Sequence, residues 1–65
     1  MEYFYKNKSH PNLDTLESLI LESTIASTYI YLKWDEQPDE ELEVELTREL
    51  TGEEKTLLDN LVAQI

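Results

Sequence analysis

Hydrophobic residues recur along this chain with two different periods, and the change of period divides the chain into elements. Leucine and isoleucine return every three or four positions across residues 12–23, which predicts a helix with one buried side. A second stripe of the same period predicts a helix over residues 52–64. The members of this second stripe are Leu57, Leu58, Leu61, Val62 and Ile65.

Start signals support both helices. Asn12 or Asp14 can cap the first helix, because a short side chain with an oxygen atom can accept a hydrogen bond from a free N–H group of the first turn. Thr51 and Glu54 have the spacing of a capping box, in which each side chain bonds the backbone N–H of the other residue. The second helix is therefore expected to begin directly after Thr51.

Alternation replaces the helical period in the middle of the chain. Residues 24–34 are rich in Thr, Ile and Tyr, which favour strands, and residues 41–50 alternate apolar residues with glutamate. Pro38 lies between them and indicates a turn, so the two strands are expected to form an antiparallel hairpin. The register that joins apolar to apolar residues pairs Trp34 with Leu42, Leu32 with Val44 and Ile30 with Leu46, and on the other face Lys33 with Glu43, Tyr31 with Glu45 and Tyr29 with Thr47.

Residues 1–11 allow two interpretations. Their first positions alternate in the manner of a short strand, and "EYFY" places three aromatic residues within four positions. The segment is either a third strand of the same sheet or an arm that contacts a neighbouring chain. The predicted fold class is α+β, a small α-β-β-α module with an antiparallel hairpin, and residues 1–65 form a single domain.

The size of the chain predicts a partner. A domain of 65 residues buries only about 60% of its unfolded surface and is marginal alone. There is no cysteine for a disulfide, and one histidine is too few for a histidine-based zinc site. Oligomerisation, or docking on a larger body, therefore remains as the source of added stability; we expect a homo-oligomer, with no cofactor and no metal.

Acidic residues dominate the charge. The formal net charge is −10, and residues 35–54 carry ten of the acids against the single base Arg48. Three of these acids share one face of the predicted strand over residues 41–50. This acidic face consists of Glu41, Glu43 and Glu45.

The acidic segment has three interpretations. It can be a solvated surface that protects a strand edge from aggregation. It can imitate the phosphates of DNA and occupy a basic site on a nucleic-acid-binding protein. It can also hold a divalent cation around Asp35, Asp39 and Glu40, although the segment lacks the spacing and the glycine of a calcium loop.

Several classes of function are disfavoured. A chain this short has little room for a cleft that would separate the pKa values of two carboxyl groups, so we predict that it is not an enzyme. Its negative charge opposes binding to nucleic acid and to anionic lipid. It has no run of 18 apolar residues to span a membrane, and its first residues lack the apolar core of a signal peptide.

Contact with other chains is the remaining prediction. Aromatic residues are typical interface anchors, and the apolar faces and strand edges of so small a module invite a neighbour. Arg48 interrupts the apolar side of its predicted strand, where it can reach solvent or pair with an acid of a neighbouring chain. The candidate interface residues are Tyr3, Phe4, Tyr5, Tyr29, Tyr31, Arg48, Leu58 and Ile65.

The segment "LTRELTGEEKTLLDNLVAQI" resembles a segment of small bacteriophage virion-associated proteins and of fibre-like or tail-like phage proteins. There, an alternating strand leads into a Leu-Thr-x-Glu-Glu helix start followed by Leu-Asp-x-Leu-Val-Ala. The matching residues here are Leu50, Thr51, Glu53, Glu54, Leu57 or Leu58, Asp59, Leu61, Val62 and Ala63. The phage pattern often finishes with a basic or histidine residue, whereas this chain has Gln64 and Ile65, which puts that terminal contact in doubt.

This resemblance implies a structural or assembly role in a phage particle. The implied partners are copies of the chain itself and other phage structural proteins, and the implied location is the virion or the host cytoplasm. The alternative function is an acidic inhibitor that imitates nucleic acid and binds a basic site on a host protein. Salt separates the two, because apolar self-association survives high salt whereas binding between opposite charges weakens steeply.

Overall fold

Three strands and two helices make up the chain in a computed structural model that describes all residues from 1 to 65. The elements are β1 (Glu2–Tyr5), α1 (Leu13–Leu21), a 3-10 turn η1 (Ala26–Thr28), β2 (Tyr29–Asp35), β3 (Glu41–Leu46) and α2 (Gly52–Ala63). The sheet has the order β1-β3-β2, and both neighbouring pairs are antiparallel. The predicted α+β class is therefore confirmed.

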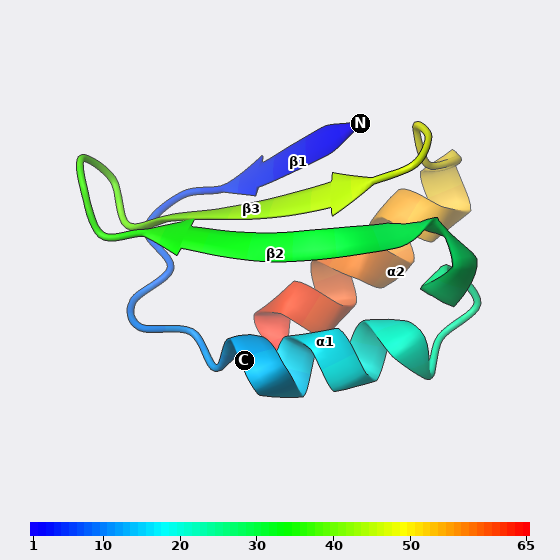
Figure 1. Ribbon diagram of the computed structural model, residues 1–65, viewed down its shortest axis with the longest axis horizontal. Coiled ribbons are helices and arrows are strands. Elements are labelled where there is room, and N and C mark those ends of the chain that lie inside the picture. Colours follow the sequence, from blue (N-terminus) through cyan, green and yellow to red (C-terminus); the bar gives the residue numbers. More distant parts are fainter.

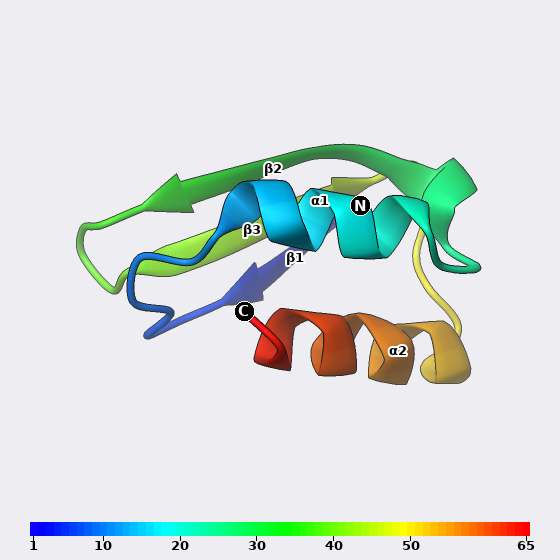
Figure 2. The same ribbon diagram turned by 90° about the horizontal axis from the view of Figure 1, so that it is seen from below.

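The two helices lie on the same side of the sheet. Figures 1 and 2 show α1 and α2 side by side beneath the strands, so the molecule has one layer of helices and one layer of sheet. The core fills the space between the layers. Its ten buried apolar residues are Leu16, Ile20, Ile25, Leu42, Val44, Leu46, Leu50, Leu58, Leu61 and Val62.

The N-terminal segment is a third strand of its own chain. In β1, Tyr3 lies opposite Val44 and Tyr5 lies opposite Leu42, so β3 becomes the central strand. Alternation turns these two tyrosines toward the helices, where they pack against the core. Of the two interpretations of residues 1–11, the structure supports the third strand of the same sheet, over residues 2–5.

The helix starts follow the sequence signals. Asn12 caps α1, and its side-chain oxygen accepts a hydrogen bond from the N–H of Thr15 at 3.1 Å. At the start of α2 both bonds of the capping box form between Thr51 and Glu54. The predicted helix over residues 12–23 is shorter than expected, because the backbone turns after Leu21.

The first predicted strand begins later than expected. Residues 24–28 form a turn and the 3-10 helix, and the strand itself starts at Tyr29. The cause is local hydrogen bonding, in which the hydroxyl of Thr28 donates to the carbonyl of Ile25 at 2.7 Å and the N–H of Ile25 donates to the hydroxyl of Ser23 at 3.3 Å. Such bonds compete with a strand ladder.

The second predicted strand ends earlier than expected. It stops at Leu46 instead of continuing to residue 50, because residues 47–50 carry the chain from the sheet to the start of α2. Leu50 still reaches the core, although it lies outside the strand. Arg48 therefore lies in an exposed connection and does not interrupt the apolar side of a strand.

The register of the hairpin is confirmed over five pairs, from Tyr31 opposite Glu45 to Asp35 opposite Glu41. It fails at the other end, where an irregularity between Tyr29 and Tyr31 places Tyr29 opposite Leu46. The predictions that Ile30 faces Leu46 and that Tyr29 faces Thr47 are therefore wrong. One extra residue in β2 shifts the pairing by one position, so Tyr29 packs against the core and Ile30 is 49% exposed.

Neither helix has both the length and the apolar character needed to cross a membrane.

Candidate functional site

One face of the sheet carries no helix, and we call it the open face. In each strand, side chains alternate between the helices and this face, so the residues that do not point to the core gather here. β3 contributes its three glutamates to the middle. The members of the open face are Glu2 and Phe4 from β1, Glu41, Glu43 and Glu45 from β3, and Tyr31, Lys33 and Asp35 from β2.

The pairing of the strands arranges these side chains in rows. One row across the sheet contains Glu2, Glu45 and Tyr31. The next row contains Phe4, Glu43 and Lys33. Directly opposed residues in a sheet lie about 4.5–5.5 Å apart at Cβ, so an aromatic ring adjoins a carboxylate in both rows.

Three carboxylates meet on this face. One oxygen atom each from Glu2, Glu43 and Glu45 lies within 4.8 Å of the others. Three carboxylates can in principle contribute to a divalent-cation site, but calcium takes six to eight oxygen ligands, and exposed acidic groups of this kind are common without an ion. The group expected from the sequence, Asp35, Asp39 and Glu40, is not brought together in this way.

Positive charge near these carboxylates is sparse. The ammonium group of Met1 lies 3.7 Å from Oε1 of Glu45, and Oε2 of Glu45 is buried without a hydrogen-bond partner. Lys33 lies opposite Glu43 in the register, but its Nζ lies 3.7 Å from Asp35. Lys33 and Glu43 are therefore register partners, as expected. The salt bridge of Lys33, however, is with Asp35 of the same strand.

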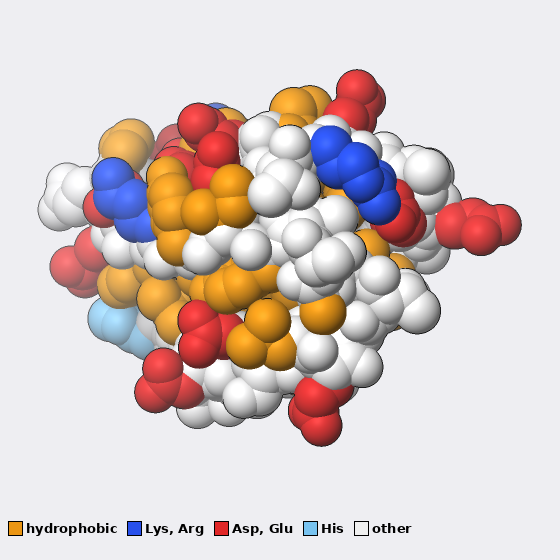
Figure 3. Space-filling view, turned by 45° about the vertical axis from the view of Figure 1, so that its right-hand side comes forward, with side chains coloured by type: hydrophobic (Ala, Val, Ile, Leu, Met, Phe, Trp, Pro, Cys, Tyr) orange, Lys and Arg blue, Asp and Glu red, His pale blue; other side chains and the backbone are white.

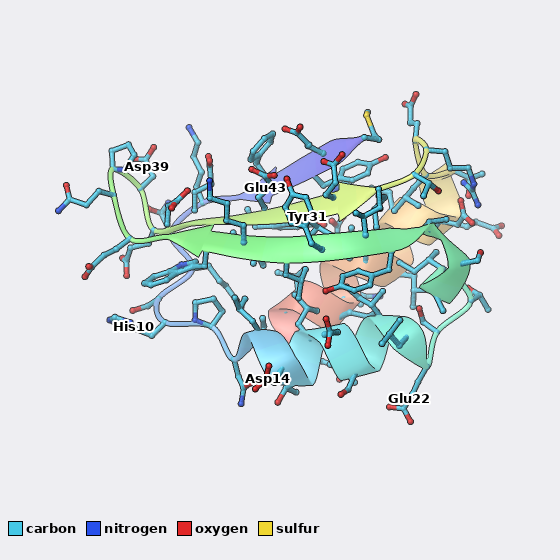
Figure 4. The ribbon with its side chains drawn as sticks, viewed as in Figure 1. His10, Asp14, Glu22, Tyr31, Asp39 and Glu43 are labelled. Carbon is cyan, nitrogen blue, oxygen red and sulfur yellow. The ribbon has the colours of Figure 1, made fainter.

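Tyr31 and Glu43 form a hydrogen bond across the open face. The phenol of Tyr31 donates to Oε2 of Glu43 at 2.9 Å, and Figure 4 shows both side chains on the side of the sheet away from the helices. This hydrogen bond to a carboxylate, together with desolvation and the charge of Glu43, raises the pKa of Tyr31. Tyr31 therefore holds its proton and acts as a donor at neutral pH.

Apolar surface accompanies the acids. Phe4 is 50% exposed and Tyr31 is 43% exposed, and Ile30, at the irregularity of β2, is 49% exposed. Figure 3 shows hydrophobic side chains gathered on the surface it draws, with carboxylates beside them. The open face thus combines aromatic side chains with negative charge, whereas a solvated sheet face is usually polar throughout.

The other two N-terminal candidates serve the fold. Tyr3 accepts a hydrogen bond from the N–H of Leu50 at 2.8 Å, and Tyr5 donates to Oδ1 of Asp59 at 2.7 Å. The Nζ of Lys55 lies 5.5 Å and 5.2 Å from the centres of their rings. Burial, with the bond to Asp59, raises the pKa of Tyr5. Tyr3 and Tyr5 tie β1 to α2 and are largely turned away from solvent.

Tyr29 and Arg48 also make contacts within the chain. Tyr29 donates to Oε2 of Glu17 at 2.7 Å, which joins β2 to α1, and burial with this bond raises the pKa of Tyr29 to about 12. Arg48 donates to both carboxylate oxygens of Glu54 at 2.8 Å. Arg48 is therefore paired inside its own chain, although the sequence had suggested solvent or an acid of a neighbouring chain.

The candidate interface residues Leu58, in α2, and Ile65, just after it, both pack against the core. Leu58 is fully buried in the core, so its prediction as an interface residue is wrong, because the apolar stripe of α2 faces the sheet and α1. Ile65 is half-buried and packs against the same core. The half-exposed leucine on the helical side is Leu21, at the end of α1.

One member of the open face, Glu2, and one exposed residue, Ile30, were missed from the sequence. Glu2 joins the carboxylates because β1 pairs with β3, and Glu2 then lies opposite Glu45. The only feature of the sequence that indicates this placement is the alternation of residues 1–6, in which Glu2 lies on the side opposite Tyr3 and Tyr5. Ile30 was expected in the core, and no feature of the sequence marks the irregularity that exposes it.

The single histidine and the single tryptophan lie together at the other end of the sheet. Their ring centres are 5.1 Å apart, and the Nε1 of Trp34 donates to the carbonyl of Lys8 at 2.7 Å. Trp34 packs against the core, so it holds the turn that contains His10 to β2. His10 lies at a bend in the connection between β1 and α1.

No pocket is found on the surface. No protein-family model, curated protein or solved structure matches the chain.

Proposed function

We propose that this chain is a non-enzymatic structural or assembly protein that contacts other protein chains through the open face and the adjoining free edge of β2. The observation that carries the proposal is the uncovered second side of the sheet, on which Phe4 and Tyr31 remain about half exposed. Aromatic side chains are enriched at protein interfaces because they bury a large area with few rotatable bonds.

The free edge of β2 supports contact between copies. In the order β1-β3-β2, the outer side of β2 has no neighbouring strand, and an unpaired edge can accept a strand from another chain. Two copies that join side by side in this way extend the sheet and leave their open faces uncovered. The setting that we propose is a bacteriophage particle, and this part rests on the resemblance of residues 50–63 to phage structural proteins.

Light scattering behind size exclusion tests the proposal. The mass of the native chain is expected to rise above 7.7 kDa with concentration and to persist at high salt. Tyr31→Ser, which changes both the open face and β2, is expected to shift the association to higher concentration. Leu21→Ser is the matched control, since Leu21 is as exposed but lies on α1. A mass of one chain at every concentration would remove self-association from the proposal.

A second candidate function is an acidic inhibitor of a nucleic-acid-binding protein. The observation that favours it is the meeting of Glu2, Glu43 and Glu45 within 4.8 Å on an exposed sheet. This function requires binding through charge alone, so the affinity for the target would fall steeply with salt and would not depend on Phe4. Displacement of DNA from a basic protein, measured at two salt concentrations, separates this candidate from the first.

A further inference from the structure

The charge of the open face is unbalanced. It carries five carboxylates, from Glu2, Asp35, Glu41, Glu43 and Glu45, against Lys33 and the ammonium group of Met1. Lys33 is already close to Asp35, and the ammonium group is already close to Glu45. The carboxylates of Glu2 and Glu43 therefore have no salt bridge, although both lie within 4.8 Å of a carboxylate oxygen of Glu45.

This arrangement favours a donor from outside the chain. Like charges at such a separation repel one another, and a cation placed between them would relieve the repulsion. A guanidinium group offers several donors in one plane and bonds carboxylates in pairs, and an ammonium group offers three.

Aromatic rings flank the carboxylates on both outer strands. Phe4 lies opposite Glu43 on β1, and Tyr31 lies opposite Glu45 on β2. An arginine or lysine has an apolar stem as well as a charged end, so its stem can lie on a ring while its end reaches a carboxylate. The face thus suits a partner that carries both basic and apolar side chains.

A second copy of the chain does not fit this face. Two open faces in contact would bring together six carboxylates from Glu2, Glu43 and Glu45, while the cations of each copy, Lys33 and the ammonium group of Met1, are already paired within their own chain. Three strands about 4.8 Å apart, each about 17 Å long, also cover only a few hundred Å², against about 800 Å² on each partner of a stable interface. Contact between copies through the edge of β2 leaves the face available.

We propose that the open face binds a basic segment of another protein, whose arginine or lysine side chains bond Glu2, Glu43 and Glu45 while its apolar side chains cover Phe4 and Tyr31. This inference rests on the proposed function and names the chemistry of the partner. The small area makes a single contact weak, so strong attachment requires several copies that act together.

Nuclear magnetic resonance titration of the full chain tests this inference. The probes are short synthetic peptides in which leucine alternates with arginine, with glutamine or with glutamate. The arginine peptide is expected to shift the backbone resonances of Phe4, Tyr31, Glu43 and Glu45 and to bind at least tenfold more tightly than the glutamine peptide. The glutamate peptide is expected to leave these resonances unchanged.

Matched variants separate the open face from the overall charge. Glu43→Gln is expected to weaken the arginine peptide about threefold to tenfold, whereas Glu22→Gln, which removes the same charge at the helical side, changes it less than twofold. Phe4→Ala is expected to weaken binding, and Leu21→Ala is not. Equal effects of Glu43→Gln and Glu22→Gln would overturn the inference, because the net charge alone would then explain the binding.

The same titration distinguishes the two proposals. If the glutamine peptide shifts the open-face resonances as strongly as the arginine peptide does, the basic partner is wrong and the proposed contact surface stands. If no peptide shifts these resonances and the native chain stays monomeric, both proposals fall. If Phe4→Ala leaves the affinity for the arginine peptide unchanged, binding is by charge alone, and the inference is overturned in favour of the acidic inhibitor.

Discussion

The phenol oxygen of Tyr3 accepts a hydrogen bond from the backbone N–H of Leu50, with 2.8 Å between oxygen and nitrogen. This bond joins the first strand to the residue just before the cap of α2, 47 positions away in sequence. It satisfies a backbone donor in the connection between sheet and helix, where no strand or helix partner is present. β1 is therefore an integral part of the fold and links its two layers.

The mutation Tyr3→Phe is expected to lower the free energy of unfolding by about 1–3 kcal/mol, because the ring remains and the N–H of Leu50 loses its acceptor. Urea denaturation followed by tryptophan fluorescence measures the change. Tyr31→Phe is the control, since its hydroxyl bonds an exposed carboxylate, and we expect a change within about 0.5 kcal/mol. Equal losses in the two variants would show that the bond to Leu50 has no special weight.

Deletion of residues 1–6 is expected to abolish cooperative unfolding. The deletion exposes one edge of the central strand and removes Tyr3 and Tyr5 from the core, and two strands without a third are marginal. Circular dichroism during heating detects the loss. A sharp transition at an unchanged temperature would mean that β1 is a dispensable arm, as one interpretation of the sequence allowed.

Much of the fold could be predicted because its signals are local. The capping box of Thr51 and Glu54 needs only four residues, and the register from Tyr31 to Asp35 needs only the alternation of two neighbouring segments. The pairing of β1 with β3 could not be decided, because it joins segments about 40 residues apart and an arm to a neighbour has the same alternation. The position of Glu2 beside Glu45 depends on that pairing.

Other errors arose where tertiary contacts or local hydrogen bonds overrode a pattern. The hydroxyl groups of Ser23 and Thr28 close a turn in a segment whose composition favours a strand. Leu58 shares a helical stripe with the half-buried Leu57, and the sequence does not say which of the two faces the core. The acidic face of β3 and the aromatic residues Phe4 and Tyr31 were identified from the sequence. That they lie on the same face of the sheet could not be predicted, because it depends on the pairing of all three strands.

Because of the irregularity in β2, substitutions at Ile30 and at Leu46 are expected to differ in their effect on the free energy of unfolding. Ile30→Ser is expected to change the free energy of unfolding by less than about 0.5 kcal/mol, since Ile30 is half exposed. Leu46→Ala is expected to cost about 2–5 kcal/mol, because Leu46 is fully buried. Denaturant titration of both variants measures the contrast. A large loss in Ile30→Ser would support the regular register, in which Ile30 faces Leu46.

Glu54 gives the stability of the protein a dependence on acid pH. Its bonds to Arg48 and to the N–H of Thr51 lower the pKa of Glu54 from 4.5 to about 2. Because the folded protein holds the deprotonated form more strongly than the unfolded chain does, this contribution is complete above pH 4.5 and is lost as the pH falls toward 2. Glu54→Gln is expected to flatten the thermal stability of the protein over this range.

The control for this measurement is Glu53→Gln, which removes a charge from the same first turn but has no bond to Arg48. This variant is expected to keep the loss of stability between pH 4.5 and 2. If the profiles of the two variants coincide, the interaction of both acids with the helix terminus explains the dependence, and the pair of Arg48 and Glu54 does not.

The hydrogen bond between Tyr31 and Glu43 can be tested by measuring the pKa of the Tyr31 phenol. A carboxylate that accepts the phenol hydrogen stabilises the protonated phenol, so the pKa of Tyr31 is raised above its ordinary value of 10.0. Glu43→Gln replaces the carboxylate by a neutral amide and is expected to lower the pKa of Tyr31 toward 10.0. The ring-carbon resonance of Tyr31, followed by nuclear magnetic resonance as the pH rises, reports this pKa directly.

The variant Glu22→Gln removes the same charge far from Tyr31 and is expected to leave the pKa of Tyr31 where it is. The arginine-leucine peptide provides the last comparison, because a guanidinium group at Glu43 competes with the phenol for the same carboxylate oxygens. Bound peptide is therefore expected to lower the pKa of Tyr31 in the native chain and to have little further effect in Glu43→Gln. If the peptide leaves the pKa of Tyr31 unchanged, its basic side chains do not bind at Glu43. That result would contradict the proposed arrangement on the open face.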